Sequence, residues 1–246
     1  MPLPSQLRHL HLPGLTPYTH PVKIQTHLLS LHLSSLTSSQ NPSPSIPSPP
    51  PPTLLTFQTP PTYTCGRREI ARLTPSQITH LRANNTAAFH ESLRGGQTTF
   101  HGPGQLTAFL ILNLKTHGFT SRSYIQFLET SVIAVLARYG IVGTRTENPG
   151  VWTVGDEGRK IASVGVHLQR YITGFGVGVN VGTELGWFER IVMCGLPGKR
   201  ATTFEEEGVR GKSVEEVGRV FAGVVAEGLE GNVRMVTEEE VWGEKG

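Results

Sequence analysis

The stretch RGGQTTFHGPGQLTAFLILNL, residues 94–114, is the part of the sequence from which we predict both a core strand and a binding site. Its first part, residues 94–106, contains four glycines together with Arg94 and His101. Glycine is used where the backbone turns with positive φ or lies directly against a ligand. We therefore interpret this part as the wall of a site, with a tight hairpin of turn residues as the alternative. The run that follows, residues 106–114, is apolar enough for a buried strand.

Length and composition limit the class of protein. The 246 residues fit one domain. No apolar run reaches the roughly 18–20 residues of a membrane span, so we predict no transmembrane segment. Neither the glycines nor the ten histidines follow a nucleotide-binding or metal-ligating pattern, and the two cysteines lie far apart. We therefore expect no metal site and no disulfide scaffold.

Charge divides the chain into a basic body and an acidic end. Residues 1–204 carry 17 Lys and Arg against 8 Asp and Glu, a net +9, whereas residues 205–246 carry 5 against 11, a net −6. A basic body steers acidic protein partners toward it. The Lys and Arg residues form no concentrated run, so we do not expect nucleic-acid binding.

The beginning of the chain contains no acidic residue before Glu69. Such a beginning is typical of an organellar targeting segment. We therefore expect residues 1–16 to be a targeting or flexible segment and the location to be mitochondrial, or cytoplasmic if the protein is bacterial. Residues 21–33 are interpreted either as part of that segment or as an amphipathic helix of the folded domain. The Pro- and Ser-rich residues 41–53 are expected to form an inserted surface loop.

The remaining pattern interleaves strands and helices without regular βαβ spacing, which favours an α+β fold. One face of residues 121–139 is apolar and Gly140 follows, which predicts a helix. Ser213 and Glu216 form the pattern of a capping box that begins a second helix. Residues 231–246 are expected to be an acidic tail. Strands are predicted at residues 53–57, 98–101, 106–114, 151–154, 160–168 and 171–181.

Three residues are candidates for chemistry. Cys194 ends an apolar run and precedes Gly195, which suits a nucleophile, although a lone cysteine is more often a small core residue. Cys65 is followed closely by two arginines, which favour a thiolate. Residue types alone do not choose between the two cysteines. Lys160 begins an apolar strand, and an ammonium beside a cysteine sulfur would lower the pKa of the thiol and shuttle a proton.

Several motifs together resemble the lipoyl(octanoyl) transferase family. They are residues 94–106, 158–165 and 193–195, in that order and spacing, preceded by LLTFQTPPTYTCGR at residues 54–67. The resemblance covers roughly residues 17–200 and is interrupted by the proline-rich insertion. It implies a catalytic domain over residues 17–230, with the α+β fold of biotin and lipoate protein ligases, in which mixed sheets are flanked by helices.

The activity that the resemblance implies is a cofactor-free octanoyl transfer. The implied donor is octanoyl-acyl carrier protein, and the implied acceptors are lipoyl domains of 2-oxoacid dehydrogenase complexes and the glycine cleavage H protein. Cys194 matches the cysteine that carries the acyl thioester, and Lys160 matches the lysine that acts as general acid and base. The segments that match the acyl pocket consist of Arg94, Gly95, Gly96, Gln97, Thr98, Thr99, Phe100, His101, Ser163, Val164, Gly165, Gly176, Val177 and Gly178.

The chain also departs from the family pattern. Phe175 stands where the family usually has histidine, Gly178 where it has alanine, and His167 where arginine is common. Phe175 removes a proton carrier or hydrogen bond near the acyl pocket, which leaves the preferred chain length open. Two alternatives are an ATP-dependent lipoate or biotin ligase, whose usual Gly-Arg-Gly-x-x-Gly stretch is absent, and an inactive homologue that binds carrier proteins.

Overall fold

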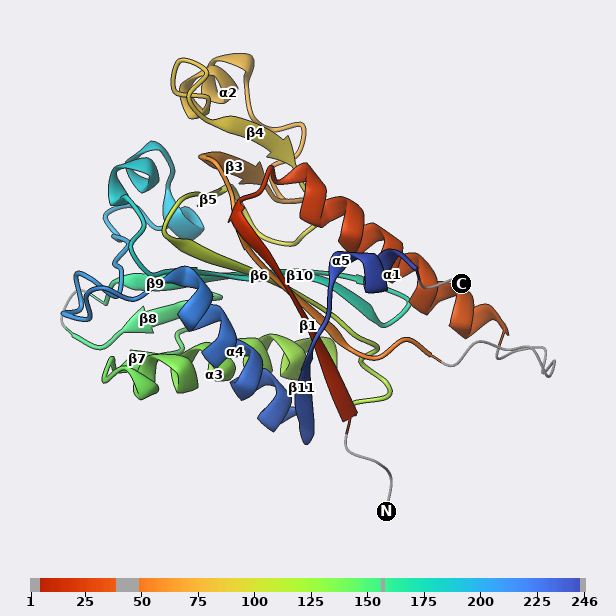
Figure 1. Ribbon diagram of the computed structural model, residues 1–246. Helices are drawn as coiled ribbons and strands as arrows, with labels where there is room; N and C mark the ends of the chain where they lie inside the picture. Colours follow the sequence, from red (N-terminus) through yellow and green to blue (C-terminus); the bar gives the residue numbers. More distant parts are fainter. Residues whose placement is uncertain (1–4, 39–48, 156–157, 244–246) are drawn as a thin grey trace.

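The strands form one large mixed sheet and one small sheet (Figure 1). The computed structural model describes residues 5–38, 49–155 and 158–243. In the large sheet, β1 is parallel to both of its neighbours and every other neighbouring pair is antiparallel. From edge to edge its strands are β11 (Gly231–Met235), β1 (Ser5–Leu15), β2 (Thr53–Gln58), β6 (Gln105–Ile111), β10 (Ile172–Asn180), β9 (Lys160–Gln169), β8 (Val151–Thr153) and β7 (Gly143–Thr144).

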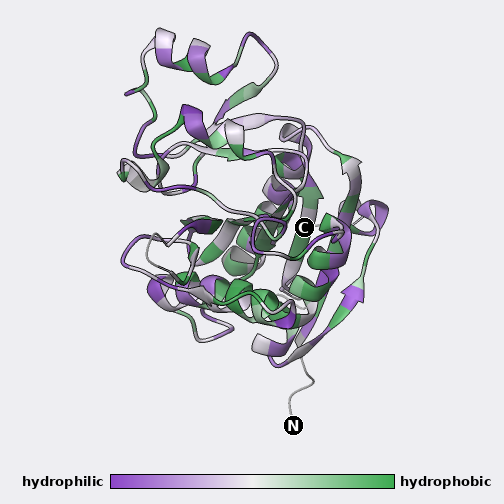
Figure 2. Ribbon diagram, turned by 90° about the vertical axis from the view of Figure 1, so that its left-hand side faces the viewer, coloured by the Kyte–Doolittle hydropathy of each residue, from purple (hydrophilic) through white to green (hydrophobic). Residues whose placement is uncertain are grey.

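Helices cover both faces of the large sheet, which confirms the α+β prediction. On β6, Leu106 and Ala108 belong to the core on one face, and Phe109 and Ile111 to the core on the other. Alternate residues of a strand point to opposite faces, so a strand covered on both sides carries apolar residues on both faces. Figure 2 shows hydrophobic residues concentrated in these strands and helices. The helices are α3 (Ser121–Arg138) and α4 (Val214–Gly228) on the first face, and α1 (Thr19–Ser38) with α5 (Glu238–Trp242) on the second.

The small sheet stands beside the second face. It has the order β4 (Ala88–Glu91), β3 (Thr62–Cys65) and β5 (Thr99–His101), and α2 (Pro75–Leu81) lies over it (Figure 1). A glycine turn connects β5 with β6 and therefore joins the two sheets. At Gly104 the φ is +76°, and a Cβ atom would lie 2.4 Å from the carbonyl oxygen of Gly182. The positive φ and this close contact together restrict position 104 to glycine.

Several predicted elements are confirmed. Of the two interpretations of residues 21–33, the helix of the folded domain is the one found, as part of α1, and the helix over residues 121–139 is α3. At the start of α4, the Ser213 hydroxyl accepts a hydrogen bond from the Glu216 N–H at 3.0 Å. The predicted strands correspond to β2, β5, β6, β8, β9 and β10. Residues 39–48, which form most of the proline-rich insertion, lie outside the described residues.

The two ends of the chain differ from the prediction. The expected flexible segment is wrong for residues 5–15, which form β1 with Leu7, Leu10 and Leu12 buried. The expected tail is wrong for residues 231–243, where β11 pairs with β1 and α5 buries Val241. In both cases backbone hydrogen bonds to distant strands decide the structure, and side-chain composition does not report them.

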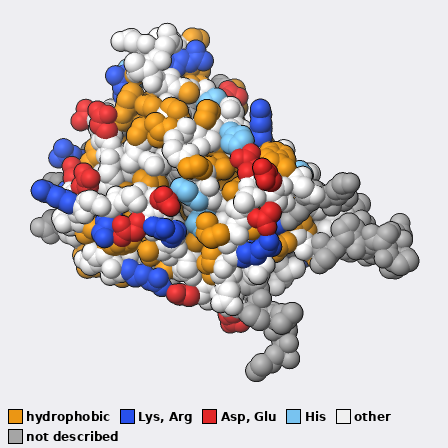
Figure 3. Space-filling view, in the orientation of Figure 1, with side chains coloured by type: hydrophobic (Ala, Val, Ile, Leu, Met, Phe, Trp, Pro, Cys, Tyr) orange, Lys and Arg blue, Asp and Glu red, His pale blue; other side chains and the backbone are white. Residues whose placement is uncertain are grey.

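Surface charge is dispersed on the face that Figure 3 displays, where Lys and Arg side chains are interspersed with Asp and Glu. None of the helices in the described part of the chain is long and apolar enough to cross a bilayer. The described residues also contain no group of three or more His, Cys, Asp or Glu side chains placed to hold a metal ion.

Three buried histidines predict an acid-sensitive fold. Burial lowers the pKa of His9, His32 and His101 to about 4, from about 6.5 in the unfolded chain. Between these pH values the unfolded chain binds protons that the folded chain does not bind. The free energy of unfolding should therefore fall as the pH drops from 6.5 toward 4, by up to roughly 1.4 kcal/mol per pH unit for each histidine.

Urea unfolding between pH 7 and pH 4.5 measures this slope. His32→Met removes one of the three groups and should lower the slope by up to about 1.4 kcal/mol per pH unit. The control is His80→Gln, because His80 is exposed on α2. An equal slope in wild type and His32→Met would contradict the assignment to buried histidines.

Candidate functional site

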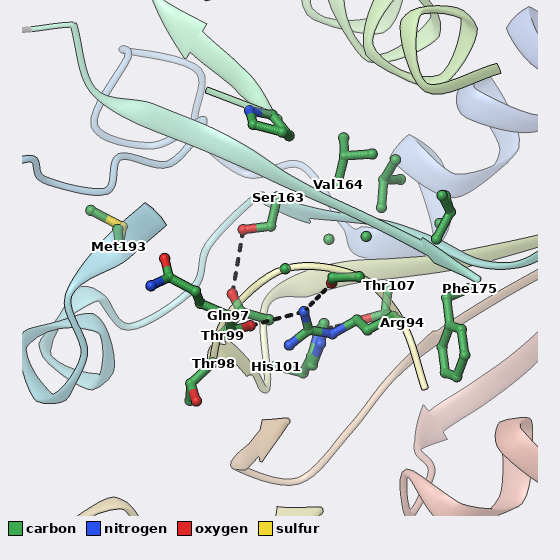
Figure 4. Close-up of a pocket in the computed structure, with 18 of the residues that line it drawn as sticks. Arg94, Gln97, Thr98, Thr99, His101, Thr107, Ser163, Val164, Phe175 and Met193 are labelled. Atoms are coloured by element: carbon green, nitrogen blue, oxygen red, sulfur yellow. Dashed lines mark hydrogen bonds between the residues drawn. The ribbon is translucent and has the colours of Figure 1, made fainter. Parts of the chain in front are cut away.

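The candidate site is a cavity of about 280 Å³ between the glycine-rich stretch and the second face of the large sheet. One wall is formed by residues 94–99 with His101, and the floor by β6, β9 and β10. In Figure 4, Met193 lies at one end of this cavity and Phe175 at the other. Thr99 and Ser163 lie between them, with their hydroxyl oxygens 3.4 Å apart. The cavity is therefore elongated along the sheet.

Glycines open the floor of the cavity. Strand register places two rows of facing residues across β6, β10 and β9. The central residue of each row is a glycine, so the backbone of β10 is exposed to the cavity. At Gly176 a Cβ atom would lie 2.3 Å from the carbonyl oxygen of Ala108, so a side chain does not fit. The rows are Thr107, Gly178 and Ser163, followed by Phe109, Gly176 and Gly165.

Arg94 holds the wall in shape. Its side chain is buried, and the guanidinium donates hydrogen bonds to the carbonyl oxygens of Thr64 at 2.6 Å, Gly95 at 3.0 Å and Gln97 at 2.9 Å. Burial lowers the pKa of this guanidinium. Through these bonds Arg94 organises the glycine-rich stretch, and it is itself one of the residues that line the cavity.

His101 contributes a neutral ring to the wall. Its Nδ1 lies 2.8 Å from Gln105 Oε1, and the Gln105 amide nitrogen donates to Asn180 Oδ1 and to the Phe100 carbonyl oxygen, both at 3.0 Å. Gln105 Oε1 is therefore an acceptor, so Nδ1 carries the hydrogen and Nε2 has the free electron pair. Burial lowers the pKa of His101 to about 4, which keeps the ring uncharged near neutral pH.

Lys160 enters the cavity from the first residue of β9. It is only 6% exposed, and Nζ donates a hydrogen bond to the Pro149 carbonyl oxygen at 3.0 Å. The stem lies on Gly150, whose φ is +124° and where a Cβ atom would lie 2.5 Å from Lys160 Cε. A lysine at the head of a strand usually extends its ammonium toward water. The structure instead buries it beside the cavity.

The segment of Cys194 passes the end of the cavity at which Met193 lies. The backbone of Cys194 belongs to the short helix η2 (Met193–Gly195), and its side chain lies outside the described part of the structure. Met193 lines the cavity, and a Cβ atom on Gly195 would lie 3.2 Å from the Gln97 amide. Farther on, residues 200–202 pair with the backbone of Lys160. The chain therefore passes from Met193 at the cavity to the strand position of Lys160.

Cys65 does not reach the cavity. It is buried in β3, and its Sγ donates to the Gly66 carbonyl oxygen at 3.6 Å. Burial raises the pKa of this thiol, and the nearby arginines do not reverse that effect. Arg67 and Arg68 are exposed, and Arg68 lines the cavity. Cys65 is a core residue.

The structure brings nearly all of the predicted binding residues to one cavity, and Phe100 is the exception. On β5 the side chains of Thr99 and His101 face the cavity, so Phe100 points to the other side. There its ring stacks on Trp187 of η1 (Leu185–Arg190) with the centroids 5.2 Å apart. The prediction that Phe100 lines the pocket is wrong. The predicted site residues that do line the cavity are Lys160, Arg94, Gly95, Gly96, Gln97, Thr98, Thr99, His101, Ser163, Val164, Gly165, Gly176, Val177 and Gly178.

Sequence reasoning missed several cavity residues. Thr107 and Phe109 could have been predicted from the sequence. Alternate residues of a strand lie on one face, so both belong to the same face of the predicted strand over residues 106–114. Tyr18 precedes α1 and stacks on His101 with the centroids 5.9 Å apart. Pro149 supplies the oxygen that holds Lys160. Neither Tyr18 nor Pro149 had a signal in the sequence, because only the folded chain brings them to the site.

Comparisons with known proteins agree on one family. The model of the lipoyl protein ligase A/B catalytic domain matches residues 42–226. The chain is 46% identical over 172 residues to a probable octanoyltransferase of Schizosaccharomyces pombe, covering 69% of this chain and 75% of that protein. It is 38% identical to a mitochondrial octanoyl-acyl-carrier-protein:protein N-octanoyltransferase of Danio rerio, covering 82% and 83%.

Solved structures share the fold at low sequence identity. A lipoate-protein ligase A bound with ATP gives a TM-score of 0.67 at 13% identity, covering 97% of this chain and 91% of that one. A putative lipoate protein ligase of Thermoplasma acidophilum with bound lipoic acid gives 0.64 at 13% identity, covering 97% and 91%. The expected ligase-type α+β fold is confirmed.

Proposed function

We propose that this chain, which belongs to the octanoyltransferase family of lipoyl protein ligase A/B catalytic domains, transfers an octanoyl group from acyl carrier protein to a lysine of a lipoyl domain. The observation that carries the proposal is the position of Lys160. It lies at one end of an elongated, largely apolar cavity, at the end that the Cys194 segment passes. A nucleophile and a proton carrier at the mouth of an acyl-sized cavity suit acyl transfer.

The first step forms an acyl-enzyme. The Cys194 thiolate attacks the carbonyl carbon of the donor thioester, the new C–S bond forms, and the bond to the pantetheine sulfur breaks. Lys160 donates its proton to the departing pantetheine thiolate. Thiolates are both good nucleophiles and good leaving groups, so one cysteine can accept and release the acyl group.

The second step forms the amide. The amine of the acceptor lysine attacks the Cys194 thioester, Lys160 accepts a proton from that amine, and Cys194 leaves as a thiolate. Between the steps the acyl chain occupies the cavity, where burial contributes about 0.8 kcal/mol per methylene. The glycine floor supports this role because it leaves a channel along the sheet.

The proposed partners follow from the reaction. The donor is octanoyl-acyl carrier protein, which the name of the Danio rerio relative contains. The acceptors are lipoyl domains of 2-oxoacid dehydrogenase complexes and the glycine cleavage H protein. The net charge of +9 over residues 1–204 suits acidic partners. A mitochondrial location is supported by relatives that are named mitochondrial in Danio rerio, Arabidopsis thaliana and Saccharomyces cerevisiae.

A reconstituted assay tests the function. The purified chain is mixed with octanoyl-acyl carrier protein and an unmodified lipoyl domain, and intact mass spectrometry follows octanoylation of the domain. Modification without ATP is the expected result. A parallel reaction contains free octanoate and ATP, and modification only there would identify a ligase instead. A chain that binds the carrier protein but modifies nothing would identify an inactive homologue.

The position of Phe175 leads to a prediction about the length of the acyl chain that is transferred. Its ring lines the cavity at the end opposite Met193 and packs edge-on against Phe109 with the centroids 5.2 Å apart. Phe175→Ala should open this end toward the core under α1 and admit longer chains. Decanoyl has two more methylenes than octanoyl, so the ratio of decanoyl to octanoyl transfer should rise roughly tenfold.

Competition between the two acyl-carrier proteins measures that ratio directly. The control is Phe57→Ala, because Phe57 packs on Phe109 in the same core but does not line the cavity. An equal increase in both variants would assign the effect to loosened packing and remove Phe175 from chain-length selection.

A further inference from the structure

Glu129 is a buried acidic residue that the proposed reaction does not use. It lies in the middle of α3 and is only 6% exposed. Its Oε1 accepts a hydrogen bond from the Gly150 N–H at 2.9 Å. Within residues 5–38, 49–155 and 158–243, no Lys, Arg or His side chain forms an ion pair with it. A buried carboxyl group without a charged partner is costly, so its bond to the Gly150 backbone calls for an explanation.

Gly150 links Glu129 to Lys160. The residue before it, Pro149, provides the carbonyl oxygen that accepts from Lys160 Nζ at 3.0 Å. Gly150 itself has a φ of +124°, and a Cβ atom there would lie 2.5 Å from Lys160 Cε and 2.6 Å from the Ala162 carbonyl oxygen. The peptide of residues 149–150 is therefore held by Glu129 on its amide side and touches the lysine stem and ammonium on the other.

We propose that Glu129 is a positioning residue for Lys160. By fixing the Gly150 amide, it fixes the Pro149 carbonyl oxygen, and that oxygen holds the ammonium at the end of the cavity. A lysine has a flexible four-carbon stem, so a proton carrier of this type needs a fixed acceptor to stay in reach of the reacting sulfur. Glu129 does not line the cavity and contacts no reacting atom. The inference rests on the proposed role of Lys160.

Three variants of Glu129 and one control test the inference. Glu129→Gln retains an oxygen that can accept the hydrogen bond from Gly150, whereas Glu129→Ala removes that oxygen. Glu129→Asp keeps the carboxylate, but its shorter side chain moves the oxygen away from Gly150. The control is Ser131→Ala, because Ser131 is buried in the same helix and its hydroxyl bonds only to the Phe127 carbonyl oxygen among the described contacts. Thermal unfolding is measured for each variant, so that rates are compared between folded proteins.

Two quantities are measured. The first is the rate of Cys194 acylation at saturating octanoyl-acyl carrier protein, and the second is the concentration of that carrier protein at which the rate is half of its maximum. Glu129→Ala and Glu129→Asp should slow the saturated rate at least about fivefold and leave the half-saturation concentration unchanged. Glu129→Gln and Ser131→Ala should stay within about twofold of wild type. Rescue by glutamine identifies the hydrogen bond as the cause.

A double-variant cycle separates positioning from general stability. If Glu129 acts through Lys160, then adding Glu129→Ala to Lys160→Ala should cause no further loss. An additional fivefold loss in that background, or wild-type rates in both Glu129→Ala and Glu129→Asp, would overturn the inference. If Glu129→Ala does not fold, Glu129→Asp with Lys160→Ala completes the same cycle. Failure of the proposed function itself is distinguishable, because the wild-type chain would then form no octanoyl adduct on Cys194. Failure of the role of Lys160 alone would leave Lys160→Ala at the wild-type rate.

Discussion

Cys194→Ser should abolish the acyl-enzyme thioester. After exposure to octanoyl-acyl carrier protein, the wild-type chain should gain the mass of one octanoyl group, and peptide mapping should place it on Cys194. The serine hydroxyl is a far weaker nucleophile than a thiolate at neutral pH. Transfer to a lipoyl domain should fall by at least about a thousandfold, because loss of a catalytic nucleophile costs up to roughly a millionfold in enzymes where it has been measured.

Cys65→Ser is the matched control for this experiment. Cys65 is the other cysteine of the chain, and it lies buried in β3 away from the cavity. The octanoyl adduct should therefore persist in Cys65→Ser. An adduct confined to Cys65, or unchanged transfer by Cys194→Ser, would refute the assignment of Cys194 as the nucleophile.

The elements that sequence predicted well are those whose pattern is local. α3 combines an apolar face with a stop at Gly140, whose φ is +78°. β6 is apolar over residues 108–111, where its two faces contribute to two buried cores. In each element the buried positions follow the period of the helix or strand, and the apolar residues at those positions are visible in the sequence.

The elements that sequence missed depend on distant partners. β1 contains buried Arg8 and His9, so it does not resemble an apolar strand. The Arg8 guanidinium bonds to the Thr53 hydroxyl of β2 at 2.9 Å, and His9 Nε2 lies 2.7 Å from the Thr56 hydroxyl of the same strand. These partners on β2 lower the cost of burying the two side chains, although His9 Nδ1 is buried without a hydrogen bond among the described residues. No property of residues 5–15 taken alone predicts that pairing.

The candidate site likewise contains residues that a local sequence pattern predicts and residues that only the folded chain brings together. The glycine-rich motif was visible, because close backbone approach restricts the residue type at Gly176 and Gly104. The wrong assignment of Phe100 came from treating residues 94–101 as one surface, although alternate side chains of β5 face opposite sides. The arrangement around Lys160 was invisible, because Pro149 and Glu129 reach it only through the folded loop and helix.

The stretch with which the prediction began therefore has two structural roles. Residues 94–99 form a wall that Arg94 fixes through backbone carbonyl oxygens. The turn at Gly104 then joins the small sheet to the large one, where a side chain would collide with Gly182. The wall therefore lines the cavity, whereas the proposed chemistry lies at its end with Lys160 and Cys194.

Lys160→Ala should slow both formation and release of the acyl-enzyme, by roughly a hundredfold to ten-thousandfold, the range for loss of a general acid or base. Single-turnover mass spectrometry resolves the two steps. Formation is followed by the octanoyl adduct on the chain, and release by its transfer to the lipoyl domain. Lys212→Ala is the control, because Lys212 pairs with Glu216 on the surface of α4 and does not line the cavity.

Lys160→Arg separates proton transfer from positive charge at this position. The guanidinium keeps the charge and can donate to the Pro149 carbonyl oxygen, but it does not lose a proton under physiological conditions. If Lys160 carries protons, arginine should leave both steps about as slow as alanine does. If arginine restored the rate, the side chain at position 160 would act by stabilising the Cys194 thiolate. The proton carrier would then be sought elsewhere in the cavity wall, first at the neutral ring of His101.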